Sequence, residues 1–266
     1  MNNIKEAQLL RENREALVQS LNDLGIAADE DTPMSELIGL MKWSAGLRDL
    51  RLACLNKSTG AYSDYSLDEF NALSASGKAQ LVKLGLRIRA ERLDFIISKD
   101  NVYRSNGNEG IPWASSNVDV RGLTNYGAGS TGHLLDVDGE ANTDAILAYG
   151  ETANVTFEAA QQARAYKAST VADGGFDDPT KWSLPAVGQL WLLYKYRKEI
   201  NAALTSFFGT SQLITDSWYW SSTEYDVSLA WIVGMYNGGV FNFNKFNSGR
   251  VSSVAPVPLV SVSAAI

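Results

Sequence analysis

The sequence predicts an α+β fold made of two helices, antiparallel strands and long loops, with a small helical segment at the N-terminus. Apolar residues recur every three to four positions near the N-terminus and again between residues 154 and 204, which indicates amphipathic helices. After Gly209 the chain consists of short runs of β-prone residues joined by turn sequences. From residue 92 onward, stretches rich in Gly, Asn and Ser separate these runs, which is typical of a loop-rich domain.

The pattern of apolar and turn-forming residues divides the chain into a helical N-terminal segment at 1–50, a connecting region at 51–89 and a main domain at 90–266. An amphipathic helix is predicted over about 3–26, and a short second helix follows the N-cap and proline of Asp31–Pro33. Two interpretations of these helices stay open. They form a hairpin that docks on the main domain, or they attach the chain to a phage particle or to other copies in a homo-oligomer such as a trimer.

Helix and strand signals also appear in the rest of the chain. In the connecting region, Ser66 is predicted as an N-cap, with Glu69 completing a capping box. A β-strand is predicted at Leu93–Ser98. The two helices of the main domain are predicted from Asn154 to about Lys167 and, after a proline, over Ala186–Leu204.

The C-terminal part of the chain predicts four strands. The first three are Trp218–Trp220, Ala230–Met235 and Val240–Asn244, and the fourth is Arg250–Val257. The triplet Asn237–Gly239 is a strong hairpin turn signal between the second and third strands. Strands joined by such tight turns pair antiparallel.

Charge and residue counts exclude several classes of function. The net charge of −7 opposes binding to a phosphate backbone, so we expect no nucleic-acid partner. Cys54 and His133 are the single cysteine and histidine, so no intramolecular disulfide, Cys-rich zinc site or two-His zinc site can form. A Ser-His-Asp triad is nearly excluded as well. We therefore expect a protein that is not an enzyme and that uses no cofactor.

The N-terminal residues indicate where the protein is made. They are polar and charged, and they lack the apolar core of a signal peptide. No apolar run approaches the ~20 residues of a bilayer-spanning helix, so no membrane association is expected. These features predict cytoplasmic synthesis and a virion-associated or cell-associated location.

The acidic stretch Asp136–Asp144 is rich in the oxygen-bearing side chains that bind calcium in loops, but it lacks the EF-hand spacing and the terminal bidentate Glu. We interpret it as a turn held by side-chain hydrogen bonds, and expect no metal site. His133 follows a Gly-rich stretch that lacks the spacing of a phosphate loop, so we interpret it as a loop residue.

Several segments of the main domain resemble bacterial C-type-lectin-like domains. Trp182–Leu190 reads W-S-L-P-A-V-G-Q-L, which resembles the W-x-L-P helix of that family. Tyr219–Tyr225 reads Y-W-S-S-T-E-Y, and Ala230-Trp231 and an Asn-rich hairpin follow in the order of the family. The resemblance covers roughly residues 90–260 and implies a C-type-lectin-like fold. The family's final V-R-x-V run is replaced here by Val251–Val254, which lacks the arginine.

One branch of that family comprises the variable proteins of diversity-generating retroelements. In that branch, adenine-directed mutagenesis of Asn codons rewrites the last strands and diversifies a ligand-binding face. Randomising the two adenines of an AAC codon cannot produce Lys, Glu, Gln, Met or Trp, and none of these occurs among the expected variable positions. The resemblance implies these ligand-binding positions: Asp226, Ser228, Leu229, Ile232, Gly234, Tyr236, Gly239, Phe241, Phe243, Phe246 and Gly249.

Strand alternation places Phe241, Phe243 and Phe246 toward one region of the C-terminal hairpin. These rings are either core residues or an exposed patch formed together with Tyr225, Ile232 and Tyr236, and the alternation fits both. We expect the patch to bind a protein or cell-surface ligand, in a receptor-binding protein such as one on a phage tail. The alternative is a structural or surface assembly protein with the same fold and no variable role.

Overall fold

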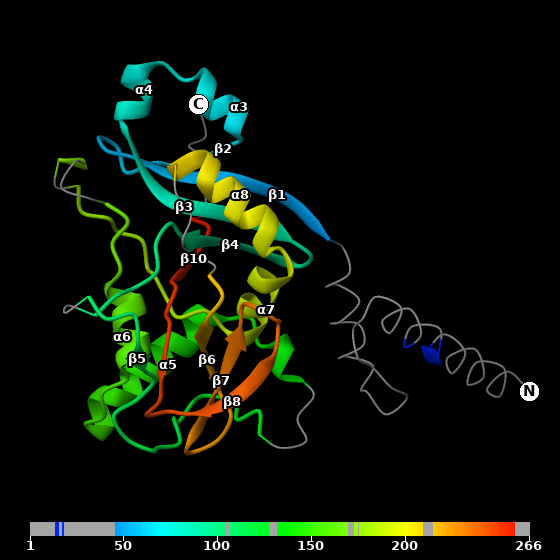
Figure 1. Ribbon diagram of the computed structural model, residues 1–266. Helices are drawn as coiled ribbons and strands as arrows, with labels where there is room; N and C mark the ends of the chain where they lie inside the picture. Colours follow the sequence, from blue (N-terminus) through cyan, green and yellow to red (C-terminus); the bar gives the residue numbers. More distant parts are fainter. Residues whose placement is uncertain are drawn as a thin grey trace, which may run out of the picture. The chain divides into compact units, whose positions relative to one another are not determined.

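The computed structural model describes residues 14–15, 18, 46–104, 107–127, 132–169, 173–174, 176–209 and 215–258 (Figure 1). Of the helix predicted over 3–26, Arg14, Glu15 and Val18 are described and are helical. The rest of that helix and the second helix after Asp31–Pro33 lie outside the described residues. The chain forms two compact units, residues 1–48 with 90–92, and residues 49–89 with 93–266.

A five-stranded sheet has the order β10-β4-β3-β1-β2. Its strands are β1 (Leu47–Asn56), β2 (Tyr62–Tyr65), β3 (Leu81–Ala90), β4 (Leu93–Ser98) and β10 (Val254–Pro256). The β1–β2 and β4–β10 pairs are antiparallel. The strand predicted at 93–98 is confirmed. The region expected to be a connector at 51–89 supplies β2, nearly all of β3 and most of β1.

Between β2 and β3 lie two short helices, α3 (Leu67–Ala72) and α4 (Ala75–Ala79). The predicted capping box is confirmed, because Ser66 accepts from the backbone N–H of Glu69 while the Glu69 carboxylate accepts from that of Ser66. This reciprocal pair satisfies two donors at the start of a helix that is too short to be stable alone.

Among the described residues of the main domain, four α-helices are present where two helices were predicted. They are α5 (Gly139–Ala153), α6 (Glu158–Ala165), α7 (Val187–Lys195) and α8 (Arg197–Phe208). The helix predicted from Asn154 corresponds to α6. Asn154 is instead the left-handed C-cap of α5. The helix predicted over 186–204 is two helices that meet at Tyr196.

Helix α5 was not predicted, since its first turn coincides with the acidic stretch interpreted as a turn. The Asp138 carboxylate accepts from the Ala141 N–H at 3.0 Å and caps the helix. The predicted hydrogen-bonding role of the side chain is therefore confirmed, but it begins a helix of 15 residues.

A second, three-stranded sheet has the order β6-β7-β8 and is antiparallel throughout. Its strands are β6 (Trp218–Glu224), β7 (Leu229–Gly234) and β8 (Val240–Asn244). All three correspond to predicted strands. The fourth predicted strand, at 250–257, is not continuous. The chain forms β9 (Ser248–Gly249), which pairs with β5 (Ile111–Pro112), and then β10 in the other sheet.

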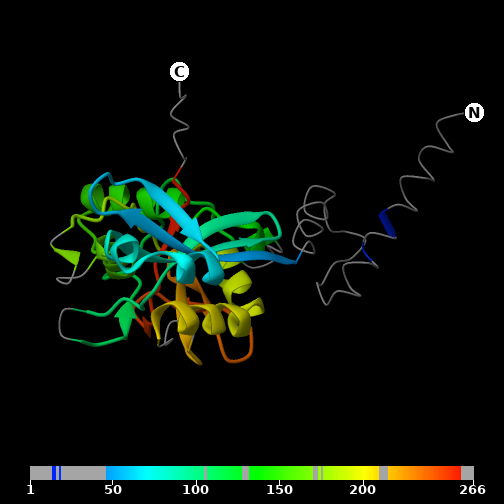
Figure 2. The same cartoon turned by 90° about the horizontal axis from the view of Figure 1, so that it is seen from above.

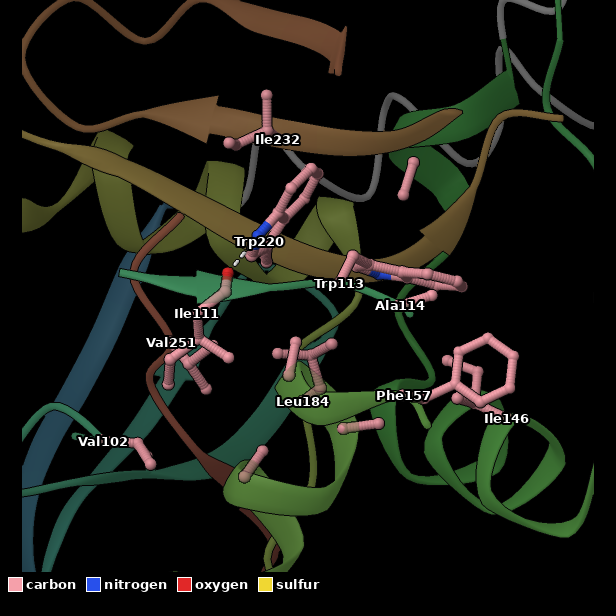
Figure 3. Close-up of a cluster of buried hydrophobic side chains, with 14 of the residues drawn as sticks. Val102, Ile111, Trp113, Ala114, Ile146, Phe157, Leu184, Trp220, Ile232 and Val251 are labelled. Atoms are coloured by element: carbon pink, nitrogen blue, oxygen red, sulfur yellow. Dashed lines mark hydrogen bonds between the residues drawn. The ribbon is translucent and has the colours of Figure 1, made fainter. Parts of the chain in front are cut away.

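The core beside the three-stranded sheet is aromatic (Figure 3). Trp220 is fully buried and donates its indole N–H to the carbonyl of Ile111 at 2.8 Å. Trp113 donates likewise to Ser221 at 2.8 Å and packs edge-on against Phe157 of the α6 N-cap. Burying large rings whose N–H groups are satisfied stabilises the core without leaving an orphan donor.

Helix α8 lies beside the five-stranded sheet in both views (Figures 1 and 2). Lys83 of β3 donates to the carbonyl of Phe207 at 2.8 Å, and the Phe207 ring meets Phe70 of α3 edge-on. Among the described residues, no helix is long and apolar enough to cross a bilayer. The described fold is thus α+β, with antiparallel sheets and helices packed around them.

Candidate binding face

The register of the three-stranded sheet determines which side chains share a face. Phe241 lies opposite Ile232, and Phe243 lies opposite Ala230, so these side chains project to the same side. Trp231 projects to the other side, where the rings of His133 and Tyr225 contact it. Tyr225 therefore does not join Phe241 and Phe243, contrary to the grouping expected from the sequence.

An aromatic hollow opens on the face that carries Phe241 and Phe243. The Trp218 ring meets Tyr236 edge-on at 5.2 Å between centroids and Phe241 at 5.4 Å. Together with Ile232, Asn242 and Phe243 they line a cavity of about 360 Å³. We call these six residues the aromatic face.

The rings of the aromatic face are accessible to solvent. Tyr236 is 46% exposed, Phe241 51% and Phe243 42%. Phe246, just beyond β8, is 52% exposed but does not line the hollow. The two interpretations left open by strand alternation are thereby decided, because the three phenylalanines are surface residues and not core.

The eleven expected variable positions fall into three groups. The exposed ones are Tyr236, Phe241, Phe243 and Phe246, the half-buried ones are Asp226, Ser228, Leu229 and Gly239, and the buried ones are Ile232, Gly234 and Gly249. Ile232 contributes the buried floor of the hollow.

Two buried glycines among these positions have no room for a side chain. A Cβ at Gly249 would lie 2.8 Å from the Trp220 ring, and one at Gly234 would lie 3.0 Å from the Trp218 ring. The expectation that Gly234 and Gly249 contact the ligand is therefore corrected, because any larger residue at either position would displace a tryptophan.

Sequence reasoning missed two residues of the aromatic face. Neither Trp218 nor Asn242 was among the expected ligand-binding positions. Strand alternation places the Asn242 side chain on the side opposite the two phenylalanines, because it lies between them and pairs with Trp231. Trp218 also shares its face with Trp220, two residues on, which is buried.

A buried ion pair anchors the hairpin that carries the face. The Lys245 ammonium, directly after β8, pairs with the Glu224 carboxylate at the end of β6, and both residues are fully buried. Lys245 also donates to the carbonyl of Val118 at 2.7 Å and lies 4.8 Å from the centroid of the Trp113 ring. The Glu224 carboxylate accepts from the Val120 N–H at 3.1 Å.

Burial dominates the titration of both groups in this pair. It raises the pKa of Glu224 and lowers that of Lys245, and their mutual hydrogen bond opposes both shifts. No feature of the sequence marked Lys245 as buried, since lysine is among the residues least often found in a core.

The exposed residues of 218–254 share one property, which is that none is charged. They are Val227, Tyr236, Asn237, Phe241, Asn242, Phe243, Phe246, Asn247 and Ser248. Of the charged residues in this range, Glu224 and Lys245 are buried and Asp226 and Arg250 are half-buried. Trp231 and Met235 are buried as well. The hairpin therefore combines a fixed interior with an uncharged aromatic and amide surface.

The acidic stretch of α5 is occupied by internal contacts. Asn142 donates to Asp136 at 2.8 Å, and Asp144 accepts from both Arg164 and Lys181 at 2.6 Å. Burial raises the pKa of Asp136. In the part of the chain that the structure describes, no group of three or more His, Cys, Asp or Glu side chains is placed to hold a metal ion.

Comparisons with known proteins give little further information. No family model matches the chain, and no curated protein matches it. Among solved structures, it is similar to a fimbrial protein from Bacteroides ovatus ATCC 8483, with a TM-score of 0.44 and 17% identity over 63% of this chain. The match spans 36% of the fimbrial protein, about a third of its length. A likeness at this level carries no argument about function.

Proposed function

We propose that this chain is a binding protein that recognises a protein or cell-surface ligand through its aromatic face, and that it is not an enzyme. The observation that carries the proposal is the hollow of about 360 Å³ bordered by half-exposed Tyr236, Phe241 and Phe243. Soluble proteins seldom leave several large apolar rings together in water unless the patch contacts a partner.

The chemistry of the face suits recognition. Tyr and Phe provide large contact areas with few rotatable bonds, so little conformational entropy is lost on binding. Exposed Asn237 and Asn247 of the same hairpin add amides that both donate and accept hydrogen bonds. Antibody combining sites use the same mixture of rigid aromatic anchors and adaptable polar groups.

We further propose that residues 90–266 form a C-type-lectin-like domain whose hairpin surface is diversified by a retroelement. The resemblance of Trp182–Leu190 and Tyr219–Tyr225 to that family supports this. So does the pairing of β4 with β10, which brings the two ends of the segment together.

The distribution of residue types in the hairpin is a second line of support. All nine exposed residues of 218–254 are types that an AAC codon yields when its two adenines change. The types that such a codon cannot yield are Trp218, Trp220, Glu224, Trp231, Met235 and Lys245, and all but the half-buried Trp218 are buried. A diversified hairpin needs this separation between a fixed interior and a variable surface.

The test is a comparison of the codons of residues 218–254 with the surrounding genome. We expect a reverse transcriptase gene and a near-copy of the segment that differs only at adenines, with the differences concentrated at exposed positions. If neither the copy nor the reverse transcriptase exists, the diversified-surface proposal is wrong. The alternative, a structural or surface assembly protein without a variable role, then becomes the better account.

The remaining proposal concerns location. We propose that the N-terminal segment attaches the binding domain to a phage tail or another cell-associated particle, or joins copies into an oligomer such as a trimer. Electron microscopy of particles labelled with an antibody against the chain tests this, and label confined to free protein would contradict it.

A further inference from the structure

We propose that the free edge of β8 accepts an extended, uncharged strand of a protein partner, whose alternate side chains then pack on Phe241 and Phe243. This inference rests on the proposed function and names the class of ligand: a polypeptide segment bound by strand addition.

The first argument is the direction of the backbone groups of β8. The backbone N–H of Gly234 donates to the Gly239 carbonyl at 2.8 Å, and the backbone N–H of Lys245 donates to the Ser228 carbonyl at 3.1 Å. In an antiparallel ladder these bonds recur at every second residue, so Phe241 and Phe243 also bond toward β7. The amide groups of Val240 and Asn242 therefore point outward, away from the sheet.

The second argument is that β8 lacks the protection found on other edges among the described strands. In the five-stranded sheet, edge strand β10 contains Pro256, and edge strand β2 contains Asp64. On the far side of the three-stranded sheet, β6 is covered by the segment at Arg250, whose carbonyl accepts from the Trp220 N–H at 2.9 Å. Proline, charge and covering segments are the usual devices that block strand pairing.

In the part of the chain that the structure describes, none of these devices is found at β8. Its sequence, V-F-N-F-N, contains no proline and no charge, and its register with β7 is continuous. The edge is accessible, since Asn242 is exposed. An open strand edge promotes aggregation, because another chain can pair with it. The presence of such an edge beside an aromatic hollow is consistent with its use as a docking site.

The third argument identifies the chemistry of the incoming strand. An antiparallel strand at this edge would meet Phe241 and Phe243 in non-hydrogen-bonded pairs, where side chains approach most closely. Apolar or aromatic residues at alternate positions would fill the hollow. A charged residue there would lose its hydration and find no opposite charge among the exposed residues of 218–254.

The experiment uses the full chain and a short synthetic peptide in which threonine alternates with phenylalanine, with binding followed by fluorescence polarisation. Asn242→Pro removes the outward amide without breaking the β7 ladder, and proline is tolerated on edge strands. Asn242→Thr is the matched control, because it keeps the backbone N–H and changes only a side chain that projects away from Phe241 and Phe243. We expect the proline variant to bind at least about tenfold more weakly than the threonine variant, the equivalent of one good hydrogen bond.

A second measurement does not depend on how the proline variant folds. The same peptide, N-methylated at the amides that would face β8, should fail to bind the wild-type chain. If the methylated peptide binds as well as the parent, or if the wild-type chain does not bind the parent peptide, strand addition is wrong.

Two further outcomes separate this inference from the proposed function. Loss of binding in Phe241→Ser with full binding in Asn242→Pro would overturn strand addition and leave the aromatic face as the ligand site. Concentration-dependent dimerisation of the wild-type chain, abolished in Asn242→Pro, would show that a second copy occupies the edge and would also overturn the proposal. Loss in Asn242→Pro but not in Asn242→Thr supports it.

Discussion

Lys245 has an environment unlike that of the other lysines described. Its ammonium is fully buried with Glu224, and each partner is further held by backbone groups of the 118–120 segment. A buried ion pair contributes little net stability relative to apolar residues, but removing one partner leaves an uncompensated charge. At this position the pair joins the end of β8 to the end of β6, and so determines where the hairpin lies.

The first prediction concerns this pair. Lys245→Met should lower the free energy of unfolding by about 3–5 kcal/mol, since Glu224 would remain buried without a counter-charge. Urea denaturation measures the change. Lys181→Met, which removes an exposed ion pair with Asp144, is the control and should cost less than about 1 kcal/mol. Equal losses in the two variants would contradict the structural role of Lys245.

Cys54 provides an intrinsic reporter of folding. It is fully buried, and burial raises the pKa of its thiol to about 12. Only the thiolate reacts with alkylating agents, so the folded protein should react very slowly at pH 8. The second prediction is that the rate of maleimide labelling rises with urea in parallel with unfolding. Fast labelling of the native chain would show that β1 is not packed as described.

At the scale of elements, an ion-pair network supports the five-stranded sheet. Asp64 of β2 pairs with Arg51 of β1 and Arg87 of β3, and Arg87 also pairs with Asp94 of β4 at 2.7 Å. Burial raises the pKa of Asp64, but the hydrogen bonds and charges of Arg87 and Arg51 lower it by more. The pKa of Asp64 therefore lies below its usual value.

The third prediction gives the pH dependence that follows from Asp64. Because its folded-state pKa is lower than its unfolded value of about 3.9, the carboxylate stabilises the fold above pH ~4. That contribution is lost as the pH falls through the folded-state pKa. Asp64→Asn should therefore lower the melting temperature at pH 6 and flatten its decline below pH 4. Arg51→Met should move the decline to higher pH. An unchanged acid profile in Asp64→Asn would contradict the network.

Some elements could be predicted from sequence and others could not, for physical reasons. The capping box at Ser66 and the strand Leu93–Ser98 have local causes, so their residues suffice to predict them. Helix α5 was missed because Asp138 and Asp144, which cap and pair within the fold, look like ligands when their partners are unknown. The break at Tyr196 has neither Gly nor Pro to mark it.

At the scale of the whole molecule, alternation identifies which side chains share a face, but not which part of a face is covered. One end of the face of the three-stranded sheet is closed, because Ile111 and Gly249 pack on Trp220. The other end, at Phe241 and Phe243, stays open. That difference depends on the pairing of β5 with β9, a contact between residues far apart in the chain, and no local pattern predicts it.

The central claim is that the chain is a fixed scaffold with a surface that tolerates substitution. It is tested by two libraries in which AAC codons with randomised adenines replace four residues each. One library changes exposed Tyr236, Phe241, Phe243 and Phe246, and the other changes buried Ile111, Tyr219, Val233 and Val251.

The measurement is the fraction of members in each library whose Cys54 stays protected from maleimide. We predict protection in most members of the exposed library and in few of the buried one, since large-to-small changes in a core cost about 2–5 kcal/mol each. Loss of protection at the same frequency in both libraries would show that the aromatic face is part of the core, and would contradict the account.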